Sequence, residues 1–336
     1  MRTDVGAATA APPLPDLAIR TYRPGDEAAV SQLWNRAAEH DGVPWRTNAE
    51  ELASWFGTSN DMFDPARDLF LVERDGQLVA TADAEWVDTT DGLREFRMGC
   101  NVDPALRRQG IGTWLQQHIE GHAAHLAELF PSDRPVGFGS WAMETETDKI
   151  ALLERFGFAP ARTFYDMVVP SLDDVAEPSL PEGIRFEAIR DDQLKQLWDA
   201  DIEAFEDHWG GFDGSDENFE RWKSDPKWDP SLFVIAWDGD QIAGGVINEI
   251  NKTENAAFNR KRGWLRSVFV RRPWRRRGLG LAVVLRSLQV LRDRGMTSAG
   301  LGVDADNPTS AVGVYERAGF EVELRSTAYR KDPGQH

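Results

Sequence analysis

The chain repeats itself once over most of its length, and this duplication is the strongest constraint on its fold. The segment DLFLVERDGQLV, which begins at Asp68, matches SLFVIAWDGDQI, which begins at Ser231. LLERFGF, which ends at Phe158, matches VYERAGF, which ends at Phe320, and the paired segments lie 162 to 168 residues apart. A spacing of this size indicates a duplicated domain and not a solenoid of short repeats. The 336 residues are enough for two such domains, each with its own core.

The stretch from Arg266 to Gly295 combines a strand, a glycine turn and a helix. Ser267 to Val270 is a β-branched and aromatic run that predicts the end of a strand. After Gly278 and Gly280, apolar residues recur at three- and four-residue spacing and predict one buried helix face: Leu281, Val284, Leu285, Leu288 and Leu291. Free backbone N–H groups and the positive end of the helix dipole point out of such a turn, so it predicts an anion site.

Two common phosphate motifs do not fit this turn. A nucleotide P-loop needs Lys and then Ser or Thr after the last glycine, where this chain has Leu281 and Ala282. A dinucleotide fingerprint needs a third glycine, where this chain has Val283. The sequence RRRGLG, Arg275 to Gly280, lies behind a strand and resembles the acyl-CoA pyrophosphate loop of the GNAT superfamily of N-acetyltransferases. The alternative is an ordinary strand–helix turn with a basic surface.

The resemblance covers most of the chain, twice, and implies the fold of each copy. Each copy should be an α+β domain, with a mixed, mostly antiparallel sheet flanked by helices and a splayed strand pair at the acyl-CoA site. The tandem arrangement is similar to that of mycothiol synthase-like acetyltransferases. We expect a disordered tail over residues 1–16, a first domain over 17–170, an acidic proline-containing linker over 171–182 and a second domain over 183–331.

The resemblance also implies where acetyl-CoA binds in the second copy. Backbone amides of the glycine turn would hold the pyrophosphate. The strand around Val268 would run beside the pantetheine arm and polarise the thioester carbonyl. The cofactor-binding residues that this implies are Val268, Phe269, Val270, Arg275, Arg276, Arg277, Gly278, Leu279, Gly280, Leu281, Asn307 and Tyr315.

Tyr315 is the catalytic acid that the resemblance implies. In the family, the tyrosine four residues before a Gly-Phe pair, here Gly319-Phe320, protonates the leaving thiolate. A phenol with a pKa near ~10 holds a proton at neutral pH that it can give to the thiolate of a thiol with a pKa near ~8.5. The alternative for Tyr315 is plain core packing.

The first copy keeps the loop but not the tyrosine. Leu153 stands where the second copy has Tyr315, and Thr145 stands where it has Asn307. We therefore expect the second domain to do the chemistry and the first to be degenerate. The first could still hold a pyrophosphate, and the alternative is that its glycine turn is only a turn. The residues of this second candidate acyl-CoA site are Arg107, Arg108, Gln109, Gly110, Ile111 and Gly112.

The segment Asp201 to Glu220, between the first two predicted helices of the second copy, is acidic and carries aromatic residues. In family terms it covers the acceptor, so we expect a small cationic amine bound by Asp207, His208, Trp209 and Asp304. The alternative is a solvated acidic surface. An alkylammonium with a pKa near ~10 must lose a proton before it attacks. Glu249 is our first choice for the catalytic base, with His208 and Asp304 as the other candidates.

Composition limits the partners of the chain. The 56 acidic and 38 basic residues give a net charge of −18, which argues against nucleic acid and against anionic membranes. The single cysteine, Cys100, rules out an intramolecular disulfide and favours a reducing compartment. No apolar run approaches the ~20 residues of a membrane span, and no His/Cys cluster has metal-ligand spacing. We expect a cytoplasmic protein, either a monomer with an internal pseudo-dimer or a homodimer.

These observations predict direct transfer of an acetyl group, in a ternary complex, to the primary amine of a small, cationic metabolite or antibiotic. The first alternative is another acceptor: a peptide or protein amine, or a thiol-precursor amine as in mycothiol synthase. The second is a CoA-binding protein without turnover. Tyr315 and Asn307 argue against the second alternative, since a pure sensor needs no acid.

Overall fold

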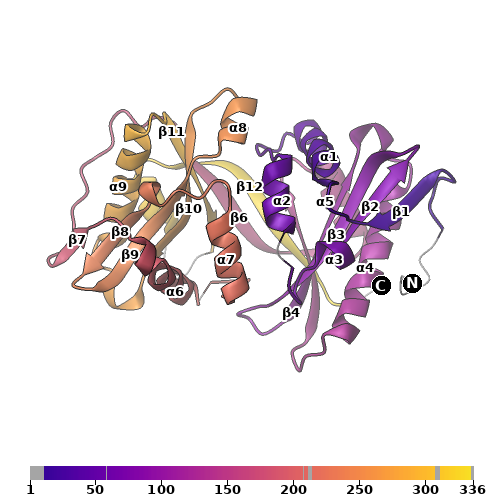
Figure 1. Ribbon diagram of the computed structural model, residues 1–336, viewed down its shortest axis with the longest axis horizontal. Coiled ribbons are helices and arrows are strands. Elements are labelled where there is room, and N and C mark those ends of the chain that lie inside the picture. Colours follow the sequence, from indigo (N-terminus) through magenta and orange to yellow (C-terminus); the bar gives the residue numbers. More distant parts are fainter. Residues whose placement is uncertain (1–10, 58, 207, 211–213, 307–310, 334–336) are drawn as a thin grey trace. The chain divides into compact units, whose positions relative to one another are not determined.

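A computed structural model describes residues 11–57, 59–206, 208–210, 214–306 and 311–333. The chain forms two compact units (Figure 1). Unit 1 comprises the residues up to Ala161, the short segment Trp209–Gly211 and the residues from Thr327 onward. Unit 2 comprises Arg162–His208 and Phe212–Ser326.

Unit 1 is built on a sheet with the strand order β1-β2-β3-β4-β5. Neighbouring strands are antiparallel from β1 to β4, whereas β4 and β5 run parallel. Asp75, at φ 51°, and Gly76, at φ 75°, form the predicted Asp-Gly turn between β2 and β3. The strands are β1 (Leu17–Thr21), β2 (Leu69–Arg74), β3 (Gln77–Asp88), β4 (Arg94–Val102) and β5 (Val136–Met143).

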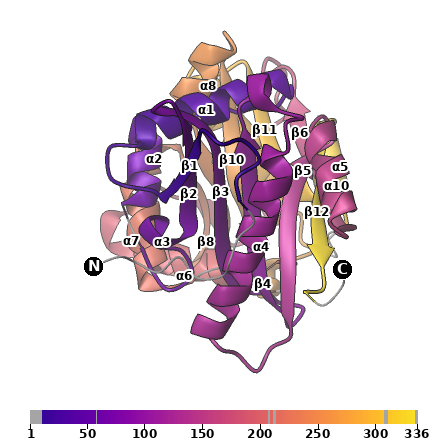
Figure 2. The same cartoon turned by 90° about the vertical axis from the view of Figure 1, so that its right-hand side faces the viewer.

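Helices cover both faces of this sheet (Figure 2). On one face, Trp34 of α1 donates a hydrogen bond of 2.9 Å from Nε1 to Thr81 Oγ1 of β3. On the other face, Leu115 and Ile119 of α4 pack in one apolar cluster with Phe96 of β4. The helices are α1 (Glu27–His40), α2 (Ala49–Phe56), α3 (Pro65–Asp68), α4 (Ile111–Leu129) and α5 (Thr147–Arg155).

Unit 2 repeats this plan, with the strand order β6-β11-β10-β9-β8-β7. Strands β7 to β10 form antiparallel pairs, β10 and β11 run parallel, and β11 and β6 are antiparallel. The turn between β8 and β9 is Gly239-Asp240, so Asp238 of the predicted Asp-Gly turn is the last residue of β8, and Gly239 has a φ of 60°. The strands are β6 (Ala159–Val169), β7 (Ile184–Phe186), β8 (Val234–Asp238), β9 (Gln241–Glu249), β10 (Arg262–Val270) and β11 (Ser298–Asp304).

The helices of unit 2 also lie on two faces. Asn248 of β9 donates a hydrogen bond of 3.1 Å to Ser287 Oγ of α9, and Leu197 of α6 packs with Ile247, the neighbouring residue on the other face of β9. Alternate strand residues therefore face α9 and α6. The helices are α6 (Leu194–Phe205), α7 (Asp216–Ser224), α8 (Lys252–Ala257), α9 (Leu279–Asp293) and α10 (Ala311–Arg317).

Each unit contains a parallel strand pair that separates partway along its length. In unit 1 the pairing of β4 with β5 runs from Arg94–Val136 to Arg97–Gly139, although β4 continues to Val102. In unit 2 the pairing of β10 with β11 ends at Trp264–Gly300, although β10 continues to Val270. The predicted fold, a mixed and mostly antiparallel sheet with a splayed pair in each copy, is confirmed.

The last strand, β12 (Glu321–Lys331), begins in unit 2 and ends in unit 1. Arg262 of β10 pairs with Glu323 near its start, at 2.5 Å. Tyr329 is buried in the core of unit 1, and Lys331 pairs with Glu120 of α4 at 2.8 Å. The C-terminal strand thus forms an ion pair within unit 2 and contributes to the core of unit 1.

The described parts of the predicted tail and linker make specific contacts. Leu14 packs against the core of unit 1, and Asp16 pairs with Arg74 at 2.5 Å. Leu172, Val175 and Leu180, within the predicted linker 171–182, pack against the core of unit 2. The division between the units falls after Ala161, before the predicted domain end at residue 170.

Candidate active site

The glycine turn of unit 2 has the backbone form that an anion site requires. Arg276 has a φ of 60° and Gly278 a φ of 85°, so two residues of the turn adopt the left-handed conformation. Gly278 is the N-cap residue of α9, and an added Cβ there would meet nothing within 4 Å. Successive N–H groups in such a turn point the same way and form a concave anion-binding surface at the helix N-terminus.

The arginines of the turn have different surroundings. Arg275 donates hydrogen bonds of 3.0 Å from Nε to Val270 O and from Nη2 to Ala204 O, which tie the turn to the ends of β10 and α6. Arg276 and Arg277 are exposed. Arg275 therefore holds the turn in shape, and the exposed pair adds positive charge around its rim. Leu279 is buried under the turn in the core of unit 2.

The turn of unit 1 has the same backbone form. Arg108 has a φ of 64° and Gly110 a φ of 87°. Arg107 Nε donates to Val102 O at 3.2 Å, as Arg275 does to the end of β10, and its guanidinium pairs with Asp41 at 2.5 Å. The first copy thus keeps the shape of the loop as well as its glycines.

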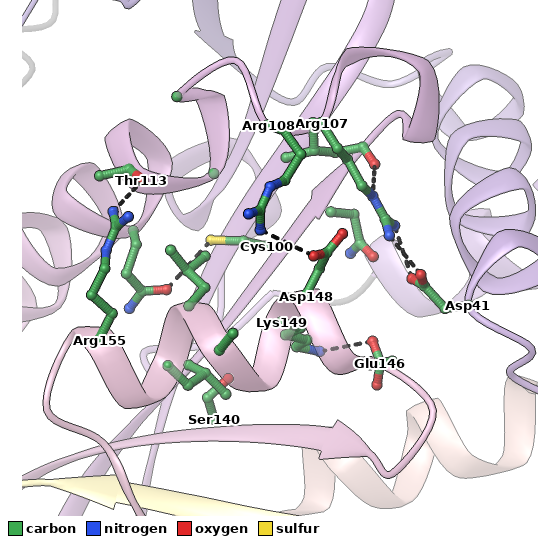
Figure 3. Close-up of a pocket in the computed structure, with 18 residues that line it drawn as sticks. Asp41, Cys100, Arg107, Arg108, Thr113, Ser140, Glu146, Asp148, Lys149 and Arg155 are labelled. Carbon is green, nitrogen blue, oxygen red and sulfur yellow. Dashed lines mark hydrogen bonds and ion pairs between the residues drawn. The ribbon is translucent and has the colours of Figure 1, made fainter.

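A cavity of about 530 Å³ opens beside the turn of unit 1 (Figure 3). It lies where β4 and β5 have separated, between α4 and α5. Of the predicted second acyl-CoA residues, four line it, whereas Gln109 is exposed and Ile111 is buried in the core. The lining residues are Asp41, Cys100, Asn101, Val102, Arg107, Arg108, Gly110, Gly112, Thr113, Gln116, Ser140, Glu146, Asp148, Lys149, Ala151, Leu152, Leu153 and Arg155.

The strand beside the turn differs between the two copies. In unit 2 the register of β9 and β10 shifts between Leu265 and Ser267, so Arg266 is the extra residue of a bulge. In unit 1, β3 and β4 pair without a shift from Ala80–Val102 to Asp88–Arg94. A bulge re-aims the backbone locally and is common next to active sites. Val268 and Val270 follow the bulge and are half-buried, whereas Phe269 faces the core that contains α6.

Tyr315 of α10 is buried, with its ring edge-on to Phe320 at 5.9 Å. Burial raises the pKa of its phenol well above the usual range. The hydroxyl therefore keeps its proton at neutral pH, as an acid must until the thiolate forms. Leu153 in α5 occupies the matching position of unit 1 and has no proton to give. Asn307 lies outside the described residues.

Glu249 ends β9 on the face that α6 covers. It opposes Trp264, immediately before the bulge of β10, and the exposed fraction of its side chain is 14%. Burial raises the pKa of its carboxyl group, and the Arg266 guanidinium, 3.5 Å away, opposes that rise. A half-buried carboxylate with a raised pKa is suited to accept a proton near neutral pH.

Asp201 of α6 is a second carboxylate on this face, and our sequence analysis gave it no catalytic role. Ser267 Oγ donates a hydrogen bond of 2.5 Å to its Oδ1, directly after the bulge. Burial raises the pKa of Asp201 to about 6. The sequence feature that could have identified Asp201 is its position four residues after Leu197, which places both side chains on the same face of the helix.

The predicted acceptor residues have different surroundings. Arg162 donates two hydrogen bonds of 2.8 Å to Asp304, which is buried, so this carboxylate is already engaged. His208 lies 4.7 Å from the Phe205 ring, and burial lowers the pKa of its imidazole. Trp209 belongs to unit 1, where Arg330 stacks on its ring at 4.1 Å. Asp207 lies outside the described residues.

Most described carboxylates of the acidic segment have partners within unit 2. Glu203 pairs with Arg271 at 2.7 Å and Glu206 with Arg272 at 3.7 Å. Two others pair with lysines: Asp216 with Lys195 at 3.4 Å, and Glu220 with Lys223 at 3.0 Å. The described residues of this segment therefore present much less unbalanced negative charge than their sequence suggests.

Metal sites and membrane-spanning helices are both absent from the described residues. Across the described ranges, no group of three or more His, Cys, Asp and Glu side chains could hold a metal ion. No helix in the described part of the chain is both long and apolar enough to span a membrane.

Comparison with known proteins identifies the family of both copies. Residues 194–320 match the Acetyltransferase (GNAT) family, and residues 65–160 match an Acetyltransferase (GNAT) domain. The chain is 28% identical to a mycothiol acetyltransferase of Geodermatophilus obscurus, over 92% of this chain and 95% of that protein. It is 29% identical to a mycothiol acetyltransferase of Thermobispora bispora, over 92% of this chain and 97% of that protein.

Solved structures agree with these matches. A GCN5-related N-acetyltransferase from Sphaerobacter thermophilus is 29% identical and superposes with a TM-score of 0.70 over 95% of this chain and 96% of that one. A tandem GNAT protein from the clavulanic acid biosynthesis pathway shares the fold, with a TM-score of 0.69 over 95% of this chain and 99% of that one, at 17% identity. The chain belongs to the GNAT acetyltransferase family: it is a tandem GNAT N-acetyltransferase, of the class that takes its acetyl group from acetyl-CoA.

Proposed function

We propose that the second GNAT domain, over residues 183–331, transfers an acetyl group to the primary amine of a thiol precursor, and that the first domain, over 17–170, holds acetyl-CoA without acetylating that acceptor. The observation that carries the choice of acceptor is the match to mycothiol acetyltransferases along nearly the full length of both chains. The proposal keeps acetyl transfer to an amine as the reaction and replaces the small cationic amine as the favoured acceptor.

Two differences between the copies support the assignment of the chemistry to the second domain. It has a buried phenol, Tyr315, where the first has Leu153. It has a bulge at Arg266, whereas β4 of the first domain pairs without a shift. An acid and a re-aimed strand backbone are both features that transfer needs and simple binding does not.

The chain's own groups suffice to hold the donor. The N–H groups of Arg276 to Leu281 and the exposed guanidinium groups of Arg276 and Arg277 would bind the pyrophosphate, with Arg275 keeping the turn in shape. The main chain of Val268 to Val270, which has left its partner β11, would bind the pantetheine arm. When bound, acetyl-CoA supplies a thioester with a carbon open to attack by an amine. A backbone amide near Val268 would polarise its carbonyl.

The acceptor must lose a proton, and the leaving thiolate must gain one. Glu249 and the Ser267–Asp201 pair lie on the same face of the sheet, beside the bulge, and both carboxylates have raised pKa values. We assign proton removal to Glu249, with the Ser267–Asp201 pair as the second candidate. Tyr315 gives its proton to the thiolate. Asp304 is engaged by Arg162, so we do not assign proton removal to it.

The charges around the site favour an acceptor with a single amine, such as a thiol precursor, over a polycation. The paired carboxylates of the acidic segment leave little field to attract a cation such as an aminated antibiotic. A thiol precursor with one primary amine and an otherwise neutral body carries a single positive charge before that amine loses its proton, so it depends less on such a field.

The test is a panel of aminothiols, each paired with the analogue in which a hydroxyl group replaces the thiol. The product is detected by mass, because thiol reagents would also react with the substrate. We expect acetylation at nitrogen, higher kcat/KM for the aminothiols, and loss of product in the Tyr315→Phe protein. Equal rates for the members of each pair would reject the thiol precursor. Acetyl-CoA binding without any turnover would reject the enzyme.

A further inference from the structure

The cavity of unit 1 contains an amine. Lys149 of α5 is among the 18 residues that line it (Figure 3). Lys149 and Leu153 are four residues apart, so they lie on the same face of α5, and both line the cavity. Leu153 matches Tyr315, and Lys149 matches Ala311 by the same offset. A long, cationic side chain therefore stands one helical turn from the position at which the second domain has its acid.

The ammonium group is held inside the cavity by a weak pair. Its Nζ lies 3.4 Å from Glu146 Oε1, and the exposed fraction of the Lys149 side chain is 27%. Its positive charge acts on the Cys100 thiol of β4 and on the buried Asp83 carboxyl of β3, and it opposes the rise that burial causes in the pKa of each. Cys100 matches Val268, the residue beside which the pantetheine arm is proposed to lie in the second domain. Lys149 is therefore close to the strand that would border a bound thioester.

We propose that Lys149 is a self-acetylation site, modified by acetyl-CoA bound in the cavity of the first domain. This inference rests on the part of the proposed function that places acetyl-CoA in that domain. The step removes one proton from the Lys149 ammonium, to the Glu146 carboxylate and then to solvent. The nitrogen forms a bond to the acetyl carbonyl carbon and loses a second proton, and the carbon–sulfur bond breaks. CoA leaves as a thiolate that takes up this second proton. The products are N-acetyl-Lys149 and CoA.

The surroundings favour Lys149 over an external amine. In the second domain the acceptor is proposed to approach from the face that holds Ser267 and Glu249. The equivalent face of unit 1 carries Arg97 of β4, which donates a hydrogen bond to the buried Gly210 carbonyl and pairs with Glu95 at 2.9 Å. Trp209, next in the chain, lies under Arg330. Protein groups therefore occupy part of this face, and Lys149 is the amine that already lines the cavity.

The modification would be self-limiting. Acetylation removes the positive charge of Lys149 and with it the pair with Glu146, and it adds an acetyl group to the cavity. A second acetyl-CoA would then meet a smaller and less cationic site. We expect one acetyl group per chain and weaker acetyl-CoA binding by the first domain afterwards.

The other lysines provide the reference. The chain has seven, so each can be followed in one peptide map. Lys195 has a side chain 48% exposed and reports the background of chemical acetylation. Lys331 is buried in the same unit, paired with Glu120, and does not line the cavity. We expect Lys149 to react at least ~10-fold faster than Lys195, because a bound donor is held beside it.

The experiment uses the full-length Gly278→Glu protein, in which the turn of the second domain carries a negative charge. Acetyl-CoA binding is measured by calorimetry, and acetylation of each lysine by peptide mass spectrometry. Lys149→Arg should abolish the fast mass increase, and an excess of CoA should suppress it without any mutation. Gly110→Glu should lower the acetylation of Lys149 to the rate of Lys195. Gly110→Ala places a side chain at the same positive φ without a charge, so Lys149 should still be acetylated faster than Lys195.

The outcomes separate this inference from the proposed function. Binding with fast acetylation of Lys149 supports it. Binding while Lys149 reacts no faster than Lys195 overturns the modification and leaves acetyl-CoA in the first domain. No binding to Gly278→Glu, with binding to the wild type, overturns both the modification and the first-domain site. The enzyme assigned to the second domain would be unaffected by that result.

Discussion

Ser267 donates a hydrogen bond of 2.5 Å to the half-buried Asp201 carboxylate, and Ser267 is the residue that follows the bulge of β10. This contact connects α6, under the proposed acceptor face, to the strand proposed to hold the pantetheine arm. Burying the charged carboxylate costs free energy, since burial raises the pKa of Asp201 to about 6 from the 3.8 of an ordinary aspartate. A carboxylate whose pKa is strongly raised by burial is a candidate functional group.

The first prediction concerns stability against pH. The folded-state pKa of Asp201 is raised, so the folded protein binds more protons than the unfolded chain between pH 4 and 6, and stability falls as pH rises through that window. Asp201→Asn removes this loss. We expect its free energy of unfolding, relative to the wild type, to improve by about 3 kcal/mol between pH 4 and pH 7, from about 1.4 kcal/mol per pKa unit. Urea unfolding at the two pH values measures these free energies. If the difference between the variant and the wild type is the same at pH 4 and pH 7, the pKa of Asp201 is not raised in the folded protein.

The second prediction separates the two candidate bases. If Glu249 removes the proton, the acidic limb of the kcat/KM profile reports its pKa, which burial raises above the usual range for a glutamate. Glu249→Gln should lower kcat/KM by roughly 10²-fold or more and remove that limb, whereas Asp201→Asn should keep it. The reverse result would assign proton removal to the Ser267–Asp201 pair. Amine acetylation measured from pH 5 to pH 9 gives both profiles.

Sequence reasoning succeeded where the structure depends on local pattern. The Asp-Gly turns and the Gly278 turn need residues that tolerate left-handed backbone, so glycine placement predicts them. It failed where the answer depends on which segments pack together. Nothing local shows that Arg266 is the extra residue of a bulge, or that Trp209 joins unit 1. The sequence also does not show that Arg162, 142 residues away, donates hydrogen bonds to Asp304, one of the candidate bases.

The third prediction counts the acyl-CoA sites. Wild-type protein should bind two acetyl-CoA molecules, and Gly278→Glu and Gly110→Glu should each bind one, because the new carboxylate occupies the proposed pyrophosphate position. Both glycines have positive φ, so any side chain costs about 1 to 2 kcal/mol of stability there. Gly278→Ala is the matched control, with the same backbone cost and no charge. If Gly278→Ala loses the site as completely as Gly278→Glu, the loss reports backbone distortion and not repulsion of a phosphate.

The last prediction tests Tyr315. Replacing it with Phe removes only the hydroxyl group, so the ring still packs edge-on to Phe320 and the fold should be retained. Without a proton for the thiolate, kcat should fall by about 10²- to 10⁴-fold, while acetyl-CoA binding measured by calorimetry should change little. Tyr329→Phe is the matched control, since Tyr329 is a buried tyrosine in the core of unit 1 and should leave kcat unaltered. A Tyr315→Phe protein with full activity would show that the buried phenol is core packing and that the thiolate takes its proton from solvent.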